Sequence, residues 1–131
     1  MPHPVRALVV DDDENILSAF EDFFRTEHCA MLSASNPEEA LRVLSGVEVN
    51  LVIADVKLEW EPGVAFCRKL KESRPKVPII VITGYPNLLP EADARSAGAD
   101  HYILKPMELD QLRGAVRKCL RGALHTSGRP C

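Results

Sequence analysis

The stretch LVIAD at Leu51–Asp55 decides the fold, because an apolar run of strand length ends there in a carboxylate. The same arrangement occurs near the N-terminus, where the apolar residues 7–10 (ALVV) precede three aspartates, residues 11–13. Two parallel strands that end at one edge of a sheet would bring Asp11, Asp12 and Asp55 together. So much negative charge in one place favours a bound divalent cation with oxygen ligands, and we predict a Mg²⁺ site at this edge.

Short apolar segments alternate with segments of helical period along the chain. Further strand-length runs at residues 30–34, 79–83 and 102–104 bring the number of predicted strands to five, with 30–34 at an edge of the sheet. Alternation of this kind is typical of an α/β protein with a parallel sheet covered by helices on both faces. Three helices are predicted from apolar stripes: Ile16, Leu17, Phe20, Phe23 and Phe24; Phe66, Cys67 and Leu70; and Leu109, Leu112, Val116 and Leu120.

Two further helices are predicted largely from the residues that begin and end them. Asn36 and Pro37 have the chemistry of an N-cap and a first helical position, and that helix ends at Gly46. Another helix is predicted over residues 88–97 and ends before Gly98, although Pro90 restricts where it can start.

Length and composition narrow the class of protein. The 131 residues fit one domain, predicted at residues 1–121, with a frayed tail at 122–131. Acidic residues outnumber basic ones by 19 to 16 and the basic residues are scattered, so we expect no direct nucleic-acid binding. The N-terminus lacks the apolar stretch of a signal peptide and the apolar runs are only strand-sized, so we expect a cytoplasmic protein without a membrane span. The four cysteines lack CxxC spacing, which argues against zinc.

Two more polar residues fall at the ends of predicted strands. Thr83 ends the fourth strand and Lys105 follows the fifth, so the edge with Asp11, Asp12 and Asp55 also carries a hydroxyl and an ammonium group. These groups match the needs of phosphoryl transfer. Asp55 would be the nucleophile, the other two aspartates would hold the metal directly or through water, and Lys105 and Thr83 would bind phosphoryl oxygens.

Each of these residues also has an ordinary structural interpretation. Asp13 and Glu14 have the chemistry of an N-cap and a first helical turn, and we predict that role for them. A strand-terminal aspartate is common in loops, Thr83 could be a plain β-branched strand residue, and Lys105 with its proline could be a turn. Their joint placement after four strands favours the functional interpretation.

At these positions the chain resembles the receiver domain of two-component response regulators. The resemblance runs from about residue 5 to residue 120 and rests on five segments: VVDDD (9–13), VIAD (52–55), VITG (81–84), AGAD (97–100) and YILKP (102–106). It implies a doubly wound, flavodoxin-like (βα)₅ fold whose five-stranded parallel sheet has the order 2-1-3-4-5.

The resemblance also implies a function. Asp55 would accept a phosphoryl group from a sensor histidine kinase or phosphotransfer protein with Mg²⁺ bound, so the protein would catalyse only its own phosphorylation and dephosphorylation. The Lys57 backbone carbonyl would complete the metal site, and the Lys105–Pro106 bond would be cis. Thr83 and Tyr102 would form a switch pair. The face built by the fourth helix, fifth strand and fifth helix would reach a downstream effector protein or an attached output domain, or a second copy in a homodimer.

The loop after Asp55 departs from the family pattern. Glu59 stands where the family usually has proline, and Pro62 stands where it usually has an acidic or small residue, although Gly63 keeps its place. Trp60 lies between them, and a tryptophan in a loop is either a partner contact or a cover over packed surface.

Three alternatives from other classes remain to be compared. An Asp-nucleophile phosphatase normally has a second aspartate two residues later, where this chain has Lys57. A flavodoxin-like flavin carrier needs a phosphate-binding loop after the first strand, where three aspartates would repel phosphate. A pseudo-receiver that acts only as a docking module is the alternative that phosphate uptake would exclude.

Overall fold

A single parallel sheet forms the centre of the molecule in the computed structural model, which describes residues 5–57 and 62–126, with side chains up to residue 121. Its strand order is β2-β1-β3-β4-β5, so the predicted doubly wound, flavodoxin-like fold is confirmed, with the 30–34 strand at an edge. The strands are β1 (Arg6–Val10), β2 (Ala30–Ala34), β3 (Leu51–Asp55), β4 (Ile79–Thr83) and β5 (His101–Leu104).

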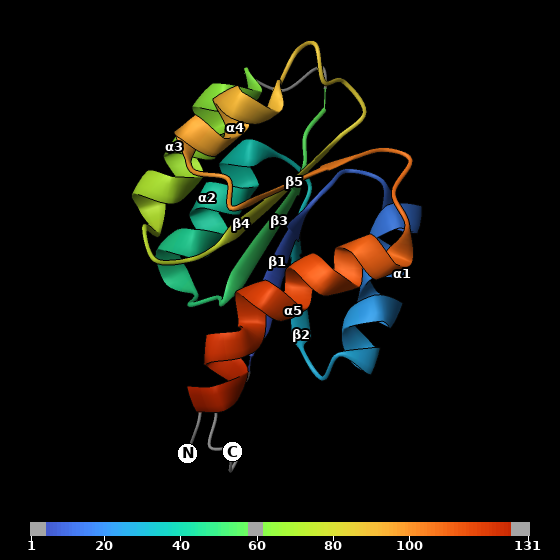
Figure 1. The fold of residues 1–131 in the computed structure, drawn as a ribbon. Coiled ribbons are helices and arrows are strands. Elements are labelled where there is room, and N and C mark those ends of the chain that lie inside the picture. Colours follow the sequence, from blue (N-terminus) through green and yellow to red (C-terminus); the bar gives the residue numbers. More distant parts are fainter. Residues whose placement is uncertain (1–4, 58–61, 127–131) are drawn as a thin grey trace.

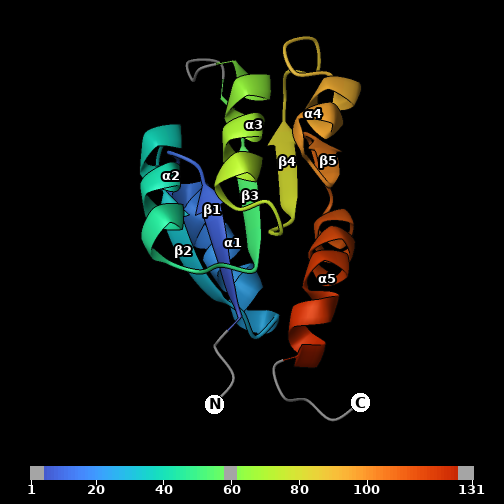
Figure 2. The same ribbon diagram turned by 90° about the vertical axis from the view of Figure 1, so that its left-hand side faces the viewer.

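Helices cover both faces of this sheet (Figures 1 and 2). They are α1 (Glu14–Thr26), α2 (Pro37–Gly46), α3 (Gly63–Ser73), α4 (Glu91–Ala97) and α5 (Leu109–Thr126). Helices α1 and α5 lie on one face, and α2, α3 and α4 lie on the other. The central strand β3 is buried along its whole length, as its continuous apolar run requires of a strand covered on both sides.

The two faces of the sheet have separate hydrophobic cores. On the α1–α5 side, Phe20, Phe23 and Phe24 are buried, and Ile16 and Leu17 pack against them in partly buried positions, as the apolar stripe predicts. On the other side, Phe66, Cys67 and Leu70 of α3 pack with residues of α2 and α4. Burial of this much apolar surface fixes the sheet and therefore the positions of the side chains at its edges.

The predicted caps of the first two helices are present. The Asp13 side chain accepts hydrogen bonds from the backbone N–H groups of Asn15 and Ile16 at the start of α1. The Asn36 side chain accepts the Glu39 N–H at the start of α2, which ends at Gly46 as predicted. These caps satisfy backbone donors that have no partner within the helix.

Helix α4 begins later than predicted, at Glu91 instead of residue 88. Pro90 is its N-cap, and Leu88 and Leu89 instead form a turn in which their N–H groups donate to the Tyr85 carbonyl. The reason is that a proline disfavours helical backbone in the residue before it, so the helix can begin no earlier than Pro90, and Pro90 itself has the extended backbone of an N-cap. The predicted end at Gly98 is confirmed.

Helix α5 continues to Thr126, beyond the domain limit predicted at residue 121. The rest of the expected tail, residues 127–131, lies outside the described residues. None of the helices in the described part of the chain combines the length and apolar character needed to span a bilayer.

Candidate functional site

The site lies at the carboxyl edge of the sheet, where β1, β3, β4 and β5 end (Figure 1). Strands β1 and β3 pair in parallel, which brings Asp11, directly after β1, beside Asp55 at the end of β3. The pairings of β3 with β4 and of β4 with β5 place Thr83 and Lys105 in the same region. The structure therefore brings together residues that are far apart in the sequence.

Asp55 is buried, with 2% of its surface exposed, and it forms an ion pair with Lys105. The distance between Asp55 Oδ2 and Lys105 Nζ is 2.6 Å. Thr83, the last residue of β4, is also buried, and its hydroxyl oxygen accepts the Tyr85 N–H at 2.9 Å. The Lys105–Pro106 bond is cis, as the resemblance implies.

The Lys57 side chain also enters the site. Its ammonium nitrogen lies 3.2 Å from Asp11 Oδ1 and 3.6 Å from Asp55 Oδ2, so one cation contacts both buried carboxylates. From the sequence we expected the backbone carbonyl of Lys57 to complete the metal site and its side chain to lie beside the phosphoryl group, but we did not expect the side chain to contact both aspartates. The signal for its side chain was its place two residues after Asp55, because alternate residues of an extended segment point to the same side.

The donor set fits a hard divalent cation. Asp11 is fully buried, and its Oδ2 is the one buried side-chain oxygen or nitrogen among the described residues that has no hydrogen-bond partner. An unpaired buried carboxylate oxygen is costly unless a cation or a donor reaches it. Oxygen ligands from Asp11 and Asp55 are the kind that Mg²⁺ prefers.

The predicted cluster of three carboxylates is not formed. Asp12 is exposed, and no three acidic, histidine or cysteine side chains in residues 5–57 and 62–126 converge in a way that could hold a metal ion. The reason is that residues that follow one another after a strand point in different directions, so Asp11 turns inward and Asp12 outward. A metal here would need other ligands, such as backbone carbonyl oxygen and water.

The two buried aspartates have opposite pKa shifts. Burial, followed by the hydrogen bond with Asp11, raises the pKa of Asp55 to about 6 against the opposing effect of Lys105. Burial also acts to raise the pKa of Asp11, but its hydrogen bonds with Asp55 and the Asp13 N–H, together with Lys57, hold that pKa below the usual value. Burial lowers the pKa of Lys57, yet Asp55 and Asp11 more than offset burial, so Lys57 remains an ammonium ion.

Tyr102, the second residue of the expected switch pair, contacts the loop after β4. Its hydroxyl donates to the Leu89 carbonyl at 2.6 Å, and its ring packs in a partly buried position against the core on the α2–α4 side. The bond joins strand β5 to the loop that leads from Thr83 to α4. The loop that follows Thr83 is therefore anchored to Tyr102 through the Leu89 carbonyl.

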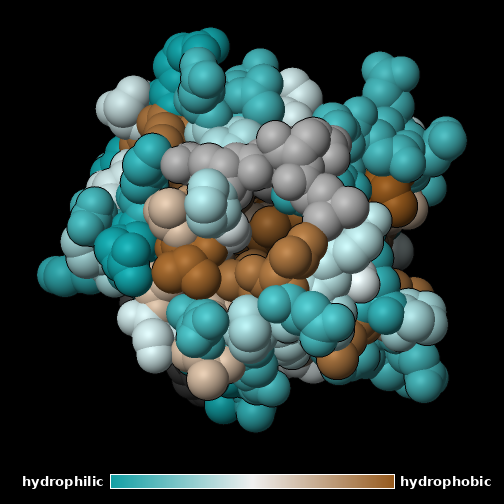
Figure 3. Space-filling model, turned by 90° about the horizontal axis from the view of Figure 1, so that it is seen from above, coloured by the Kyte–Doolittle hydropathy of each residue, from teal (hydrophilic) through white to brown (hydrophobic). Residues whose placement is uncertain are grey.

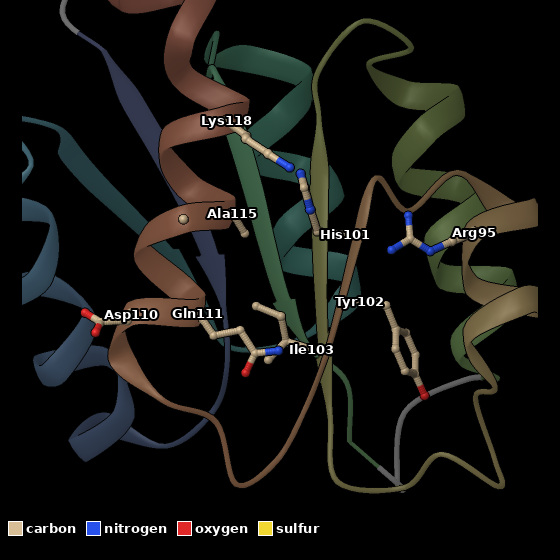
Figure 4. Close-up of a pocket in the computed structure, with 9 residues that line it drawn as sticks. Arg95, His101, Tyr102, Ile103, Asp110, Gln111, Ala115 and Lys118 are labelled. Atoms are coloured by element: carbon tan, nitrogen blue, oxygen red, sulfur yellow. The ribbon is translucent and has the colours of Figure 1, made fainter.

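A groove runs between α4, β5 and α5 beside Tyr102 (Figure 4). Arg95 of α4, His101 of β5 and Lys118 of α5 line it, and Lys118 points toward His101. Burial, Arg95 and Lys118 together lower the pKa of His101. The groove is therefore lined by basic side chains from three elements.

Apolar surface occupies the middle of the carboxyl edge and hydrophilic side chains surround it (Figure 3). In the loop between β4 and α4, Tyr85 and Leu88 are large side chains that remain exposed. Gly63 begins α3 where a Cβ atom would come within 3.0 Å of Leu89, which explains a glycine at that position. The other unusual loop residues, Glu59 and Trp60, lie outside the described residues.

The fold and this site define a class of α/β proteins with an acidic site at the carboxyl edge of a doubly wound parallel sheet. The family model of the response regulator receiver domain matches residues 7–117. The chain therefore belongs to the receiver domains of two-component response regulators.

Individual relatives agree with this assignment. The heme response regulator HssR of Staphylococcus aureus (strain MRSA252) is 32% identical over 117 residues, which cover 89% of this chain and 52% of that protein. The chain thus spans about half the length of the curated relatives it matches. A CheY-like receiver domain from Methanospirillum hungatei JF-1 superposes with a TM-score of 0.83 at 30% identity, covering 92% of this chain and 96% of that one.

A second solved structure bears on the metal. The response regulator TrrA of Thermotoga maritima, solved in complex with Mg²⁺ and BeF, has a TM-score of 0.77 at 28% identity. The similarity covers 88% of this chain and 99% of that one. A relative of the same fold therefore binds Mg²⁺.

Proposed function

We propose that Asp55 accepts a phosphoryl group in a Mg²⁺-dependent reaction and that the domain then signals through its α4–β5–α5 face. One observation carries the proposal: a buried carboxylate at the carboxyl edge of the sheet is held 2.6 Å from an ammonium group, next to the carboxylate of Asp11. This arrangement supplies a nucleophile together with positive charge for the oxygens of the transferring group.

In the proposed reaction a carboxylate oxygen of Asp55 attacks the phosphorus of a phosphohistidine. An O–P bond forms as the N–P bond breaks and its electron pair stays on the imidazole nitrogen. This leaves an acyl phosphate on Asp55 and, with a proton on the other ring nitrogen, a neutral imidazole on the donor. Lys105 would pair with one phosphoryl oxygen. The Thr83 hydroxyl uses only its oxygen to accept the Tyr85 N–H, so its hydrogen can be donated to another phosphoryl oxygen.

For the metal site we propose Asp11, Asp55 and the backbone carbonyl of Lys57 as ligands. Asp12 would act through a metal-bound water, because its side chain is exposed. When bound, Mg²⁺ supplies positive charge that screens the nucleophile from the phosphoryl oxygens and stabilises charge in the transition state.

The phosphoryl donor would be a sensor histidine kinase or a phosphotransfer protein. The receiver would pass the signal to a downstream effector protein or to an attached output domain, and the α4–β5–α5 face could also form a homodimer. The Tyr102–Leu89 bond supports this route, because it joins β5 to the loop after Thr83.

Intact-mass measurement after incubation with acetyl phosphate or phosphoramidate tests the proposal. With Mg²⁺ present, the protein should gain the mass of one phosphate, while EDTA and the substitution Asp55→Asn should each abolish the gain. Undiminished labelling of the Asp55→Asn variant would contradict the assignment of the nucleophile. Absence of labelling under all conditions would instead support a pseudo-receiver.

A further inference from the structure

The structure contains a cation of its own at the proposed metal site. We propose that the Lys57 ammonium group competes with Mg²⁺ for the carboxylates of Asp11 and Asp55 and leaves them when the metal enters, so that Lys57 sets the Mg²⁺ affinity of the site. This inference rests on the metal site of the proposed function. The role proposed here for the Lys57 side chain is separate from the role of its backbone carbonyl as a proposed metal ligand.

The geometry supports competition for the same oxygens. The Lys57 nitrogen contacts Asp11 Oδ1 at 3.2 Å and Asp55 Oδ2 at 3.6 Å, so it lies where a cation shared by the two carboxylates would lie. A divalent cation that binds both groups would have to approach this ammonium closely. Two cations that contact the same pair of carboxylates repel each other strongly in a partly buried site.

The charges of the site lead to the same conclusion. The buried carboxylates of Asp11 and Asp55 contact the ammonium groups of Lys57 and Lys105, and the exposed Asp12 adds a third negative charge near Lys57. These five groups together carry one net negative charge when all are ionised. Addition of a divalent cation would make the site positive. If one ammonium group departs, the charges balance.

Lys57 is the ammonium group that is less tightly held. Its contacts of 3.2 and 3.6 Å are longer than the 2.6 Å between Lys105 and Asp55. The side chain of Lys57 is 19% exposed and that of Lys105 is 34% exposed, so both head groups have a path to solvent and the contact distances distinguish them. If the Lys57 ammonium group leaves the two carboxylates, the ion pair between Lys105 and Asp55 stays in place for the reaction with the phosphoryl donor.

Titration with MgCl₂, followed by calorimetry or by amide chemical shifts, tests the inference without any phosphorylation. Lys57→Met removes the charge and keeps the length of the side chain, and it should lower the Mg²⁺ dissociation constant about tenfold or more. Lys57→Arg keeps the charge and should remain close to the parent. Lys76→Met removes an exposed lysine elsewhere and should change the constant by less than about twofold, since exposed charges are screened.

Thermal unfolding gives a second measurement. Without metal, Lys57→Met removes a positive charge beside two neighbouring carboxylates, so the variant should unfold at a lower temperature than the parent. Saturating Mg²⁺ should raise the unfolding midpoint of the variant by more than it raises the midpoint of the parent. Lys57→Gln serves the same purpose if Lys57→Met does not fold. Equal Mg²⁺ affinity and an equal rise in midpoint in the parent and the neutral variants would overturn the inference.

The outcomes also separate this inference from the proposed function. If Asp55 is labelled but all variants bind Mg²⁺ equally, competition by Lys57 is wrong and the proposed function stands. If the neutral variants bind Mg²⁺ more tightly but Asp55 is never labelled, the competition stands and phosphorylation is wrong. If no variant binds Mg²⁺, both are wrong.

Discussion

Asp55 is the residue whose protonation decides the chemistry of the site. Its pKa is raised to about 6, first by burial and then by its hydrogen bond with Asp11. Above that pH the carboxylate is ionised and can act as a nucleophile, and below it the neutral acid cannot. Between pH 3.8, which is the ordinary pKa of this side chain, and about pH 6, Asp55 is therefore mostly protonated in the folded protein and mostly ionised in the unfolded chain.

This shift predicts how stability depends on pH. Because the folded-state pKa is raised, ionisation of Asp55 costs folding free energy as the pH rises through about 6. In EDTA at pH 7.5 we expect Asp55→Asn to increase the free energy of unfolding by about 1–3 kcal/mol, since each pKa unit corresponds to about 1.4 kcal/mol. The gain should shrink as the pH falls toward 4. Urea unfolding at several pH values measures this gain in the free energy of unfolding. A gain that does not depend on pH would contradict the raised pKa of Asp55.

At the scale of the element, α4 shows what sequence reasoning can and cannot predict. Gly98 was predicted as the end of this helix, and its φ of 125° lies in the region that favours glycine. The predicted start was wrong, because the apolar pattern of residues 88–97 continues across Pro90 whereas the proline disfavours helical backbone before it, and the helix begins at Glu91. An amphipathic pattern thus located the helix, but local backbone restriction set its first residue.

Substitution of Gly98 tests the importance of this helix end. A Cβ atom there would lie 2.7 Å from the Cβ of Lys71, whose ammonium group pairs with Asp100. Gly98→Ala should therefore lower the free energy of unfolding by about 1–3 kcal/mol. Gly114→Ala is the matched control, because no atom beyond the adjacent residues and the local helix backbone lies within 4 Å of its Cβ position, and alanine should stabilise α5 by about 0.5–1 kcal/mol. Equal effects of the two substitutions, measured by urea unfolding, would contradict the explanation.

At the scale of the whole molecule, most of the architecture could be predicted. Alternating strands and helices specify the parallel sheet, and carboxyl ends that share one edge explain why Asp11, Asp55, Thr83 and Lys105 meet. Asp11 turns inward and Asp12 outward because consecutive residues after a strand point in different directions, which the prediction of one cluster of three carboxylates did not take into account. The bridging position of Lys57 depends on the packing of a flexible side chain, so it became visible only in the structure.

The arrangement of helices around the site also predicts where the phosphoryl donor binds. The start of α1 and the loop between β5 and α5 lie side by side, and Met107 of that loop packs against the same core as Ile16 and Leu17 (Figure 1). We expect a helical bundle of the donor protein to bind over these segments, because they border Asp55. Hydrogen exchange should show protection at residues 16–20 and 107–110 when a phosphodonor protein is added. Protection confined to α4 would contradict this expectation.

Location of the phosphoryl group within the chain tests the central claim most directly. The protein is labelled with phosphoramidate and Mg²⁺, reduced with borohydride so that an acyl phosphate on aspartate becomes homoserine, digested and analysed by peptide mass spectrometry. We predict homoserine at position 55 and at no other aspartate, and none in an unlabelled sample. Homoserine at Asp11 or Asp12, or a phosphate that survives reduction on a serine or threonine, would contradict the assignment of Asp55 as the phosphoacceptor.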